Sequence, residues 1–240
     1  MPAADVVTIV HSSDLHVDEG PTARAWGGDG AGPLAAVLDT AHALAADLVL
    51  LTGDVFEHNR LKAATLERAR TLLAAAPIPV VLLPGNHDPL MPGSVWDRGG
   101  LLETKGVHVL GAAGDRVVFD AFDLEIWGRA HTDYDDMAPL AAPPPRRARR
   151  HIAAAHGHFV EEAPPAGTHA PGWLILPDEI AATRADYVAL GHWNEHVSVG
   201  TDAVPAFYSG APDYARTVNV VRLSDAGVEV VRKDVRGLPD

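Results

Sequence analysis

Short runs of hydrophobic residues alternate with segments of helical periodicity in the first part of the chain. The runs at residues 6–10, 48–51 and 80–83 are rich in Val, Ile and Leu, which predicts buried β-strands. Between them, apolar positions recur every three or four residues over 33–46 and 61–75, which predicts two helices. Alternation of strands and helices in this order is typical of a parallel sheet covered by helices.

The pattern changes after residue 88, where short β-rich runs replace the strand–helix alternation. Gly and Asp turns separate the closely spaced runs between residues 107 and 127, which predicts an antiparallel portion. The last runs, after residue 205, predict a closing meander. The runs lie at residues 107–110, 117–119, 124–127, 152–155, 187–190, 206–209, 218–223 and 228–231.

Three segments predict connections rather than elements. Residues 20–32 and 158–177 are rich in Gly or Pro and are expected to be loops. Residues 141–150 are rich in Pro and then basic, with four arginines between 146 and 150, which predicts a surface loop or the end of a short helix. Such a cluster in an acidic protein is more typical of a solvated surface than of a phosphate-binding patch. Without an internal repeat or a linker, one domain is expected over residues 1–240, with no separate capping domain.

Composition and charge narrow the classes of protein. Hydrophobic residues make up 47% of the chain, which favours a packed α/β domain over a disordered chain. The net charge of −13 repels nucleic acid at long range, so a nucleic-acid substrate would need a local basic patch or bound metal ions. The chain has no cysteine, so nitrogen and oxygen atoms must bind any metal.

The N-terminal segment favours a cytoplasmic protein without a membrane anchor. Residues 1–5 lack a basic region, and the apolar run at 6–10 is too short for a signal peptide or a membrane span.

Polar side chains follow five of the predicted strands. Because ligands bind at the carboxyl ends of strands in α/β sheets, side chains far apart in sequence can converge there. One such residue alone is more often an ordinary turn or surface residue, but five strand ends in one chain predict a shared site. Nitrogen and oxygen donors without thiolate favour a pair of Mn, Fe, Zn or Mg ions. The residues are Asp14 and His16, Asp54, Asn86 and His87, His156, and His192.

The ordered motifs resemble the calcineurin-like metallophosphoesterases. The match is carried by Asp14-x-His16, Gly53-Asp54, Gly85-Asn86-His87-Asp88, His156 and Gly191-His192. Within that superfamily, residues 11–16, 53–56 and 208–212 are most similar to the SbcD-like DNA-repair exonuclease branch. The resemblance implies a mixed α/β fold, a four-layer αββα sandwich of two mixed β-sheets flanked by helices.

The resemblance also implies a role for each ligand. Asp14 and His16 would bind one divalent ion, and Asp54 would bridge both ions because a carboxylate can bind two cations. The second ion would be bound by Asn86, His156 and His192. Two ions, with Mn expected first and Fe, Zn or Mg as alternatives, would lower the pKa of a shared water. The resulting bridging hydroxide would attack phosphorus in line.

Two further residues of the third motif would act on the substrate side. His87 would face the leaving oxygen, as a general acid or as a group that stabilises its developing charge. Asp88 would orient His87 through a hydrogen bond. His58, which follows the Gly-Asp-x-Phe motif, is expected to contact substrate.

The last motif departs from the family pattern. The family usually reads Gly-His-x-His, whereas this chain reads Gly191-His192-Trp193-Asn194. Asn194 is expected to complete the first metal site with an amide oxygen, a weaker ligand than imidazole. His196 is the alternative if the loop bulges, and Trp193 could either stack on a substrate base or pack within the loop.

The leading hypothesis is a binuclear metal-dependent phosphoesterase that hydrolyses phosphodiester bonds, in DNA or nucleotides. The acidic charge and the expected lack of a cap favour a second hypothesis, a phosphomonoesterase or a diesterase for cyclic nucleotides or lipid headgroups. The third is a non-catalytic metal-binding scaffold of the same fold, which the replacement at Asn194 makes conceivable. His87 argues against a scaffold, because metal binding alone does not require an acid there.

Overall fold

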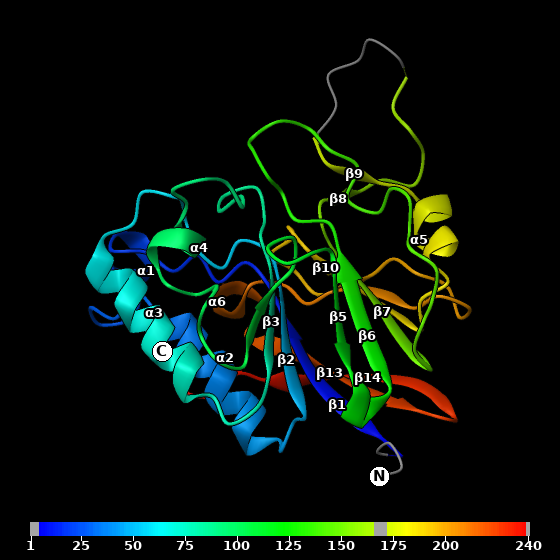
Figure 1. Cartoon of the computed structure of the whole chain (residues 1–240), viewed down its shortest axis with the longest axis horizontal. Helices are drawn as coiled ribbons and strands as arrows, with labels where there is room; N and C mark the ends of the chain where they lie inside the picture. Colours follow the sequence, from blue (N-terminus) through cyan, green and yellow to red (C-terminus); the bar gives the residue numbers. More distant parts are fainter. Residues whose placement is uncertain (1–4, 166–171, 239–240) are drawn as a thin grey trace.

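Two six-stranded sheets form the centre of the protein (Figure 1). The computed structural model describes residues 5–165 and 172–238. The first sheet contains β1 (Val7–Ser12), β2 (Leu48–Thr52), β3 (Val80–Leu83), β4 (Val107–Val109), β13 (Thr217–Ser224) and β14 (Gly227–Asp234), in the order β14-β13-β1-β2-β3-β4. The second contains β5 (Arg116–Phe119), β6 (Leu124–Gly128), β7 (Arg150–His156), β10 (Tyr187–Gly191), β11 (Val197–Ser198) and β12 (Ala206–Tyr208), in the order β11-β12-β10-β7-β6-β5.

Helices and a small strand pair complete the described part. The strand pair is β8 (His158–Phe159) with β9 (Leu174–Ile175). The helices are α1 (Pro21–Ala25), α2 (Gly32–Ala43), α3 (Ala63–Ala75), α4 (Val95–Arg98), α5 (Pro177–Thr183) and α6 (Pro212–Ala215), with a 3₁₀ turn η1 at Asp120–Phe122. α2 and α3 confirm the two helices expected from periodicity, with starts and ends that differ by at most three residues.

The apolar side chains divide into three packed layers. Along β1, Val10 packs beneath α2 and α3, whereas Ile9 faces the second sheet, because successive side chains of a strand point to opposite faces. The outer face of the second sheet packs against α5 through Ile180. Both faces of the central strands are therefore buried, which explains their continuous hydrophobic runs. This arrangement confirms two mixed sheets flanked by helices.

The expected antiparallel portion and closing meander were only partly right. β5 and β6 are antiparallel, but β4 pairs in parallel with β3 on the first sheet. β12 joins the second sheet beside β10, whereas β13 and β14 form a hairpin on the first sheet. The three C-terminal strands therefore do not form one meander. A hydrophobic run predicts a strand but not its partner.

The expected loops contain short elements. Residues 20–32 include α1, and residues 158–177 include β8 and β9. Residues 166–171 of that second segment, like residues 1–4, lie outside the described residues. α5 was missed altogether. Helices of four to seven residues are too short to show a 3.6-residue period.

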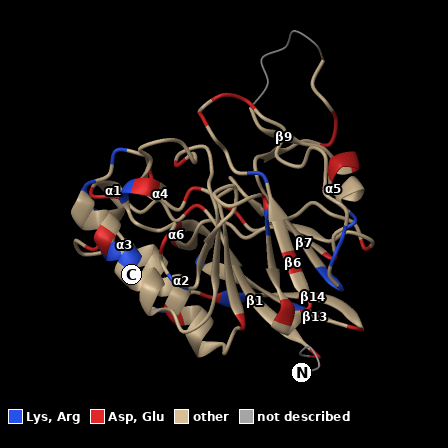
Figure 2. Ribbon diagram, in the orientation of Figure 1, with Lys and Arg blue, Asp and Glu red and all other residues tan. Residues whose placement is uncertain are grey.

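Three of the four arginines lie in a surface loop, and two of these, Arg146 and Arg149, are paired with acids, whereas Arg150 is buried at the start of β7. Arg146 contacts Asp186 at 2.5 Å, and Arg149 pairs with Asp225. The loop leads into the first residue of β7, whereas the expected ligand His156 is the last residue of that strand. The cluster therefore lies at the end of β7 away from the candidate ligands. Figure 2 shows basic and acidic positions dispersed over the ribbon.

In the part of the chain that the structure describes, no helix combines the length and the apolar character needed to cross a membrane.

Candidate metal centre

The five polar strand ends meet between the two sheets. β1, β2 and β3 are parallel neighbours in one sheet, and β7 and β10 are parallel neighbours in the other. Side chains connect the two sets: His156 Nε2 lies 3.1 Å from Asp54 Oδ2, and the His192 amide donates to Asp14 Oδ2 at 2.9 Å. The convergence expected from the sequence is present.

The loops that follow β1 and β2 run side by side beyond the sheet. The amides of Asp14 and His16 donate to the carbonyls of Gly53 and Asp54 at 3.1 and 3.0 Å. The Glu57 amide then donates to the Val17 carbonyl at 3.1 Å. This pairing extends the parallel ladder and fixes the positions of the first candidate ligands.

Ligand atoms gather in three groups, in each of which they lie within 4.8 Å of one another. Asp54 belongs to two of them and His16 to two, so the groups form one continuous cluster. The groups are Asp14, His16 and Asp54; Asp54, His156 and His192; and His16, Glu57 and His87.

Four of the expected ligands have left-handed backbone conformations. The φ angles are 55° at Asp14, 45° at His16, 50° at Asp54 and 106° at His192. Such conformations cost about 1–3 kcal/mol each in non-glycine residues and persist where surrounding contacts enforce them. The site is therefore held by the fold in a geometry that the isolated loops would not favour.

The glycines of two motifs allow the close approach of the sheets. A Cβ atom on Gly53 would lie 2.0 Å from His156 Nδ1, and one on Gly191 would lie 1.9 Å from the Thr52 carbonyl oxygen. Glycine precedes Asp54 and His192 because any side chain there would displace a ligand or a neighbouring strand.

His156 provides a test of whether the cluster fits a metal ion. Its Nδ1 donates to the Thr52 carbonyl at 2.9 Å, so in the neutral ring Nε2 carries the lone pair. That lone pair faces Asp54 Oδ2 at 3.1 Å and Asn86 Oδ1 at 3.0 Å. Three electron-pair donors directed at one another require a cation or a proton between them. Burial alone would lower the pKa of His156, but Asp54 raises it to about 9, so a proton takes the place of a cation.

The neighbouring groups carry the charges that a metal site requires. Burial raises the pKa of Asp54, but His156 and two further imidazoles outweigh burial, so this carboxyl stays ionised. Burial, reinforced by His156, lowers the pKa of His192 to about 4, which leaves a neutral imidazole. Burial disfavours the ionised form of Asp14 and raises the pKa of that carboxyl, an effect that the nearby His156 opposes. These residues fit divalent ions, and Asp54 belongs to two of the three ligand groups.

Asp88 does not orient His87 in this structure. Its oxygens accept the backbone N–H groups of Phe56 and Gly85 at 2.9 and 2.7 Å, and the side chain is fully buried. His87 Nδ1 instead donates to the Glu57 carbonyl at 3.0 Å. Asp88 therefore ties the loop after β3 to the loop after β2, which corrects the expected hydrogen bond.

His87 and His58 line an open cleft of about 650 Å³. His58 Nδ1 accepts the Arg60 amide at 3.2 Å, which leaves its Nε2 as the other polar atom of the ring. The remaining residues of the cleft are Glu57, Arg60, Asn86, Tyr134 and Trp173.

The two candidates for the last ligand occupy different surroundings. His196 Nδ1 lies 2.8 Å from Asn219 Oδ1 on β13, and its ring packs near Phe207 on β12. His196 therefore contacts strand residues of both sheets. Asn194 is exposed in a separate hollow of about 350 Å³ that His192 also lines. Trp193 stacks on Tyr208 with ring centres 4.5 Å apart, the arrangement of a packed loop aromatic.

Two residues near the ligands are not among the predicted site residues. Glu57 directly precedes His58 in the sequence, and its carboxylate lies 2.8 Å from His16 Nδ1. His131 is buried and lies 2.9 Å from the carbonyl of His156. The apolar residues that follow each ligand, such as Val17 and Phe56, were a signal that strand-like pairing continues after β1 and β2.

Solved structures with the same fold cover nearly the whole chain. The crystal structure of TT1561 of Thermus thermophilus has a TM-score of 0.61 and 13% sequence identity, over 95% of this chain and 99% of that one. Another crystal structure has a TM-score of 0.59 and 11% identity over the same shares. At these identities the likeness concerns the fold alone. No curated protein matches this chain in sequence.

The fold and the clustered donors are those of a metal-dependent hydrolase. The family model of the calcineurin-like phosphoesterases matches residues 7–208, and the chain belongs to that family. Membership supports metal-dependent hydrolysis of phosphoesters and implies divalent metal ions.

Proposed function

We propose that the protein is a binuclear metal-dependent phosphodiesterase. The observation that carries this proposal is the sharing of Asp54 between two ligand groups. Asp14 and His16 would hold one ion, and Asn86, His156 and His192 would hold the other. Two divalent ions, with Mn proposed first, would activate a water and offset the charge on a phosphoryl group.

His87 is proposed to act on the leaving group. Its Nδ1 donates to the Glu57 carbonyl, which fixes the ring and leaves Nε2 for the substrate. Its side chain is 40% exposed and lines the cleft, so a leaving oxygen can reach it. When the ring is protonated on both nitrogens, Nε2 can donate a proton to the leaving oxygen or stabilise developing negative charge there.

The cleft supports a substrate with a group on each side of the phosphate. Tyr134, Trp173 and Arg60 line it together with His58, so it offers aromatic surfaces and a cation beside the ligands. Aromatic side chains next to a cationic one suit nucleobases and phosphates. Together with the resemblance to the SbcD-like branch, this favours DNA or nucleotides.

The net charge of −13 favours a second candidate, a small phosphate ester. A monoester or a small diester needs no long basic track, whereas a polymer does. The arginine loop offers no such track, because Arg146 and Arg149 are paired with acids.

The test compares bis-p-nitrophenyl phosphate with p-nitrophenyl phosphate in Mn²⁺ for wild type and His87→Ala. We expect faster diester hydrolysis, and a decrease in kcat of about 10²- to 10⁴-fold in the variant with bound Mn²⁺ unchanged. His42→Ala, which removes an exposed imidazole on α2, is the control and should match wild type. A preference for the monoester would support the second candidate. Bound metal without turnover of either compound would support the scaffold.

A further inference from the structure

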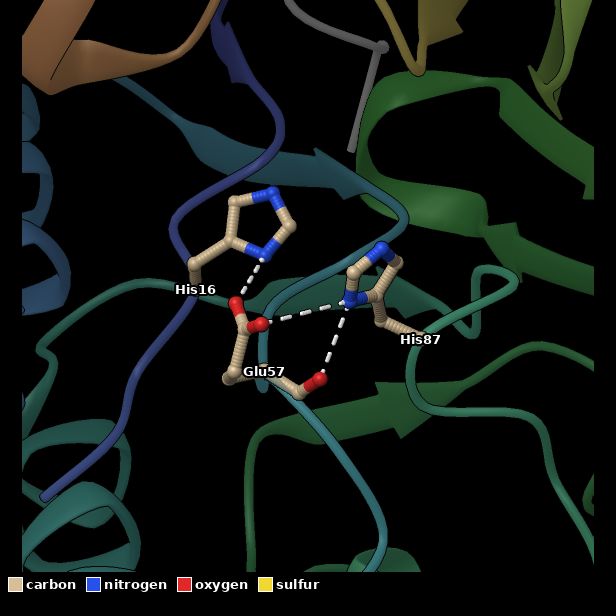
Figure 3. A group of neighbouring side chains, drawn as sticks. All are labelled: His16, Glu57 and His87. Carbon is tan, nitrogen blue, oxygen red and sulfur yellow. Dashed lines mark hydrogen bonds and ion pairs between the residues drawn. The ribbon is translucent and has the colours of Figure 1, made fainter. Parts of the chain in front are cut away.

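Glu57 is one of the residues that line the cleft, and its carboxylate lies between two imidazoles (Figure 3). Its Oε2 is 2.8 Å from His16 Nδ1, and its Oε1 is 3.7 Å from His87 Nδ1. His16 also belongs to the group with Asp14 and Asp54. The Gly-His-x-Asn motif of this chain lacks the second histidine that the family would add to this group. Glu57 offers a carboxylate to the same group.

The contact between Glu57 and His16 is short without being a hydrogen bond. His16 Nδ1 is buried and has no hydrogen-bond partner, although Glu57 Oε2 lies 2.8 Å away. Two ligand atoms that bind one ion at about 2.1 Å, at a right angle, lie about 3 Å apart. The separation therefore matches two neighbouring ligands of one ion.

The backbone fixes the position of Glu57. Its amide donates to Val17, and its carbonyl accepts the His87 Nδ1 proton, so both peptide groups of this residue are held by loops of the site. That second hydrogen bond also keeps His87 Nδ1 protonated and unavailable to a metal. Of the three residues, His16 and Glu57 remain as the ligand pair.

We infer that Glu57 is a ligand of the ion bound at His16, and that its carboxylate serves where the family has the second imidazole of the last motif. This inference rests on the proposed binuclear function. A carboxylate in place of a neutral imidazole adds a negative charge, which favours hard ions such as Mn²⁺ and Mg²⁺ over Zn²⁺. The first ion would then depend less on Asn194.

The experiment measures Mn²⁺ binding by calorimetry and Mn²⁺ paramagnetic resonance in the full chain. Glu57→Gln removes the charge and keeps the size, and Glu57→Ala is a second variant in case one of them misfolds. Glu103→Gln, which removes an exposed charge before the start of β4, away from the strand ends that carry the ligands, is the control for the charge change. Circular dichroism of the metal-free proteins checks the fold.

We expect two Mn²⁺ sites of different affinity. In both Glu57 variants the affinity of the weaker site should fall at least about tenfold, and the affinity of the stronger site should not change. The spectrum of a coupled Mn²⁺ pair should give way to that of an isolated ion, and Glu103→Gln should match wild type. If Glu57 only positioned His16, the amide oxygen of Gln would replace it, and an unchanged affinity would overturn the inference. Wild type that binds fewer than two ions would overturn the proposed function as well.

Discussion

The buried side chain of His11 makes the free energy of unfolding of the protein depend on pH. Its Nδ1 lies 2.8 Å from the Tyr187 hydroxyl, and its Nε2 lies 2.9 Å from Thr52 Oγ1, between the two sheets. Burial lowers the pKa of His11 to about 3, from an ordinary value of 6.5. The folded protein therefore keeps this imidazole neutral where the unfolded chain would protonate it.

The sign of the pH effect follows from linkage. Stability contributed by the neutral ring is fully present above pH 6.5 and is lost as the pH falls from 6.5 toward 3, because only the unfolded chain binds the proton there. His11→Gln should reduce the loss of unfolding free energy between pH 7.5 and 4.5 by about 2 kcal/mol relative to wild type. Urea unfolding at the two pH values measures this difference. Equal losses in both proteins would show that His11 does not titrate as described.

At the level of residues, the sequence predicted the set of clustered side chains, but it predicted their individual contacts less well. Six predicted ligands are brought together, because each lies at or just after the carboxyl end of a strand: Asp14, His16, Asp54, Asn86, His156 and His192. The contact of Asp88 was wrong, since adjacency to His87 does not determine where a carboxylate points. Glu57 was not predicted, because its position beside His16 depends on the pairing of two loops, which periodicity does not reveal.

At the level of elements, the site depends on how closely two strand ends approach. β10 and β2 belong to different sheets, and Gly191 at the end of β10 lies against the Thr52 carbonyl at the end of β2. No side chain can be added there without moving a backbone atom. Packing therefore requires the glycine of the Gly-His motif, in addition to the ligand role proposed for its histidine.

Gly191→Ala should destabilise the protein and loosen the metal centre. The new Cβ would lie 1.9 Å from the Thr52 oxygen and 2.8 Å from Ser13 Cβ, so the sheets must separate locally, at a cost of about 1–3 kcal/mol or more. Gly172→Ala, where the nearest atom is at 3.5 Å, is the control and should melt like wild type. Thermal unfolding with and without Mn²⁺ measures both effects. A Gly191 variant with wild-type stability and Mn²⁺ affinity would contradict the close approach.

Long hydrophobic runs and long helices were predictable, whereas partners and short helices were not. β1, β2 and β3 and the two helices between them follow from local patterns. The placement of β12 on one sheet and β13 on the other depends on contacts distant in sequence. No local pattern contains that information.

At the level of the whole molecule, the layered fold gathers buried carboxylates and imidazoles in an acidic chain. The four-layer arrangement was expected from the resemblance to the family rather than from periodicity, and the structure agrees with it. Two sheets packed face to face bring their carboxyl ends to one site. Bound cations would offset the charge of Asp14 and Asp54 there, as the proton on His156 does in their absence.

The most direct test of the proposed binuclear phosphoesterase is a titration of chelator-treated protein with Mn²⁺. Hydrolysis of bis-p-nitrophenyl phosphate and bound Mn²⁺ would be measured on the same samples. We predict no hydrolysis by the metal-free protein and a rise to a maximum as occupancy approaches two ions per chain. Full hydrolysis without bound metal, or none at any Mn²⁺ occupancy, would contradict the proposal.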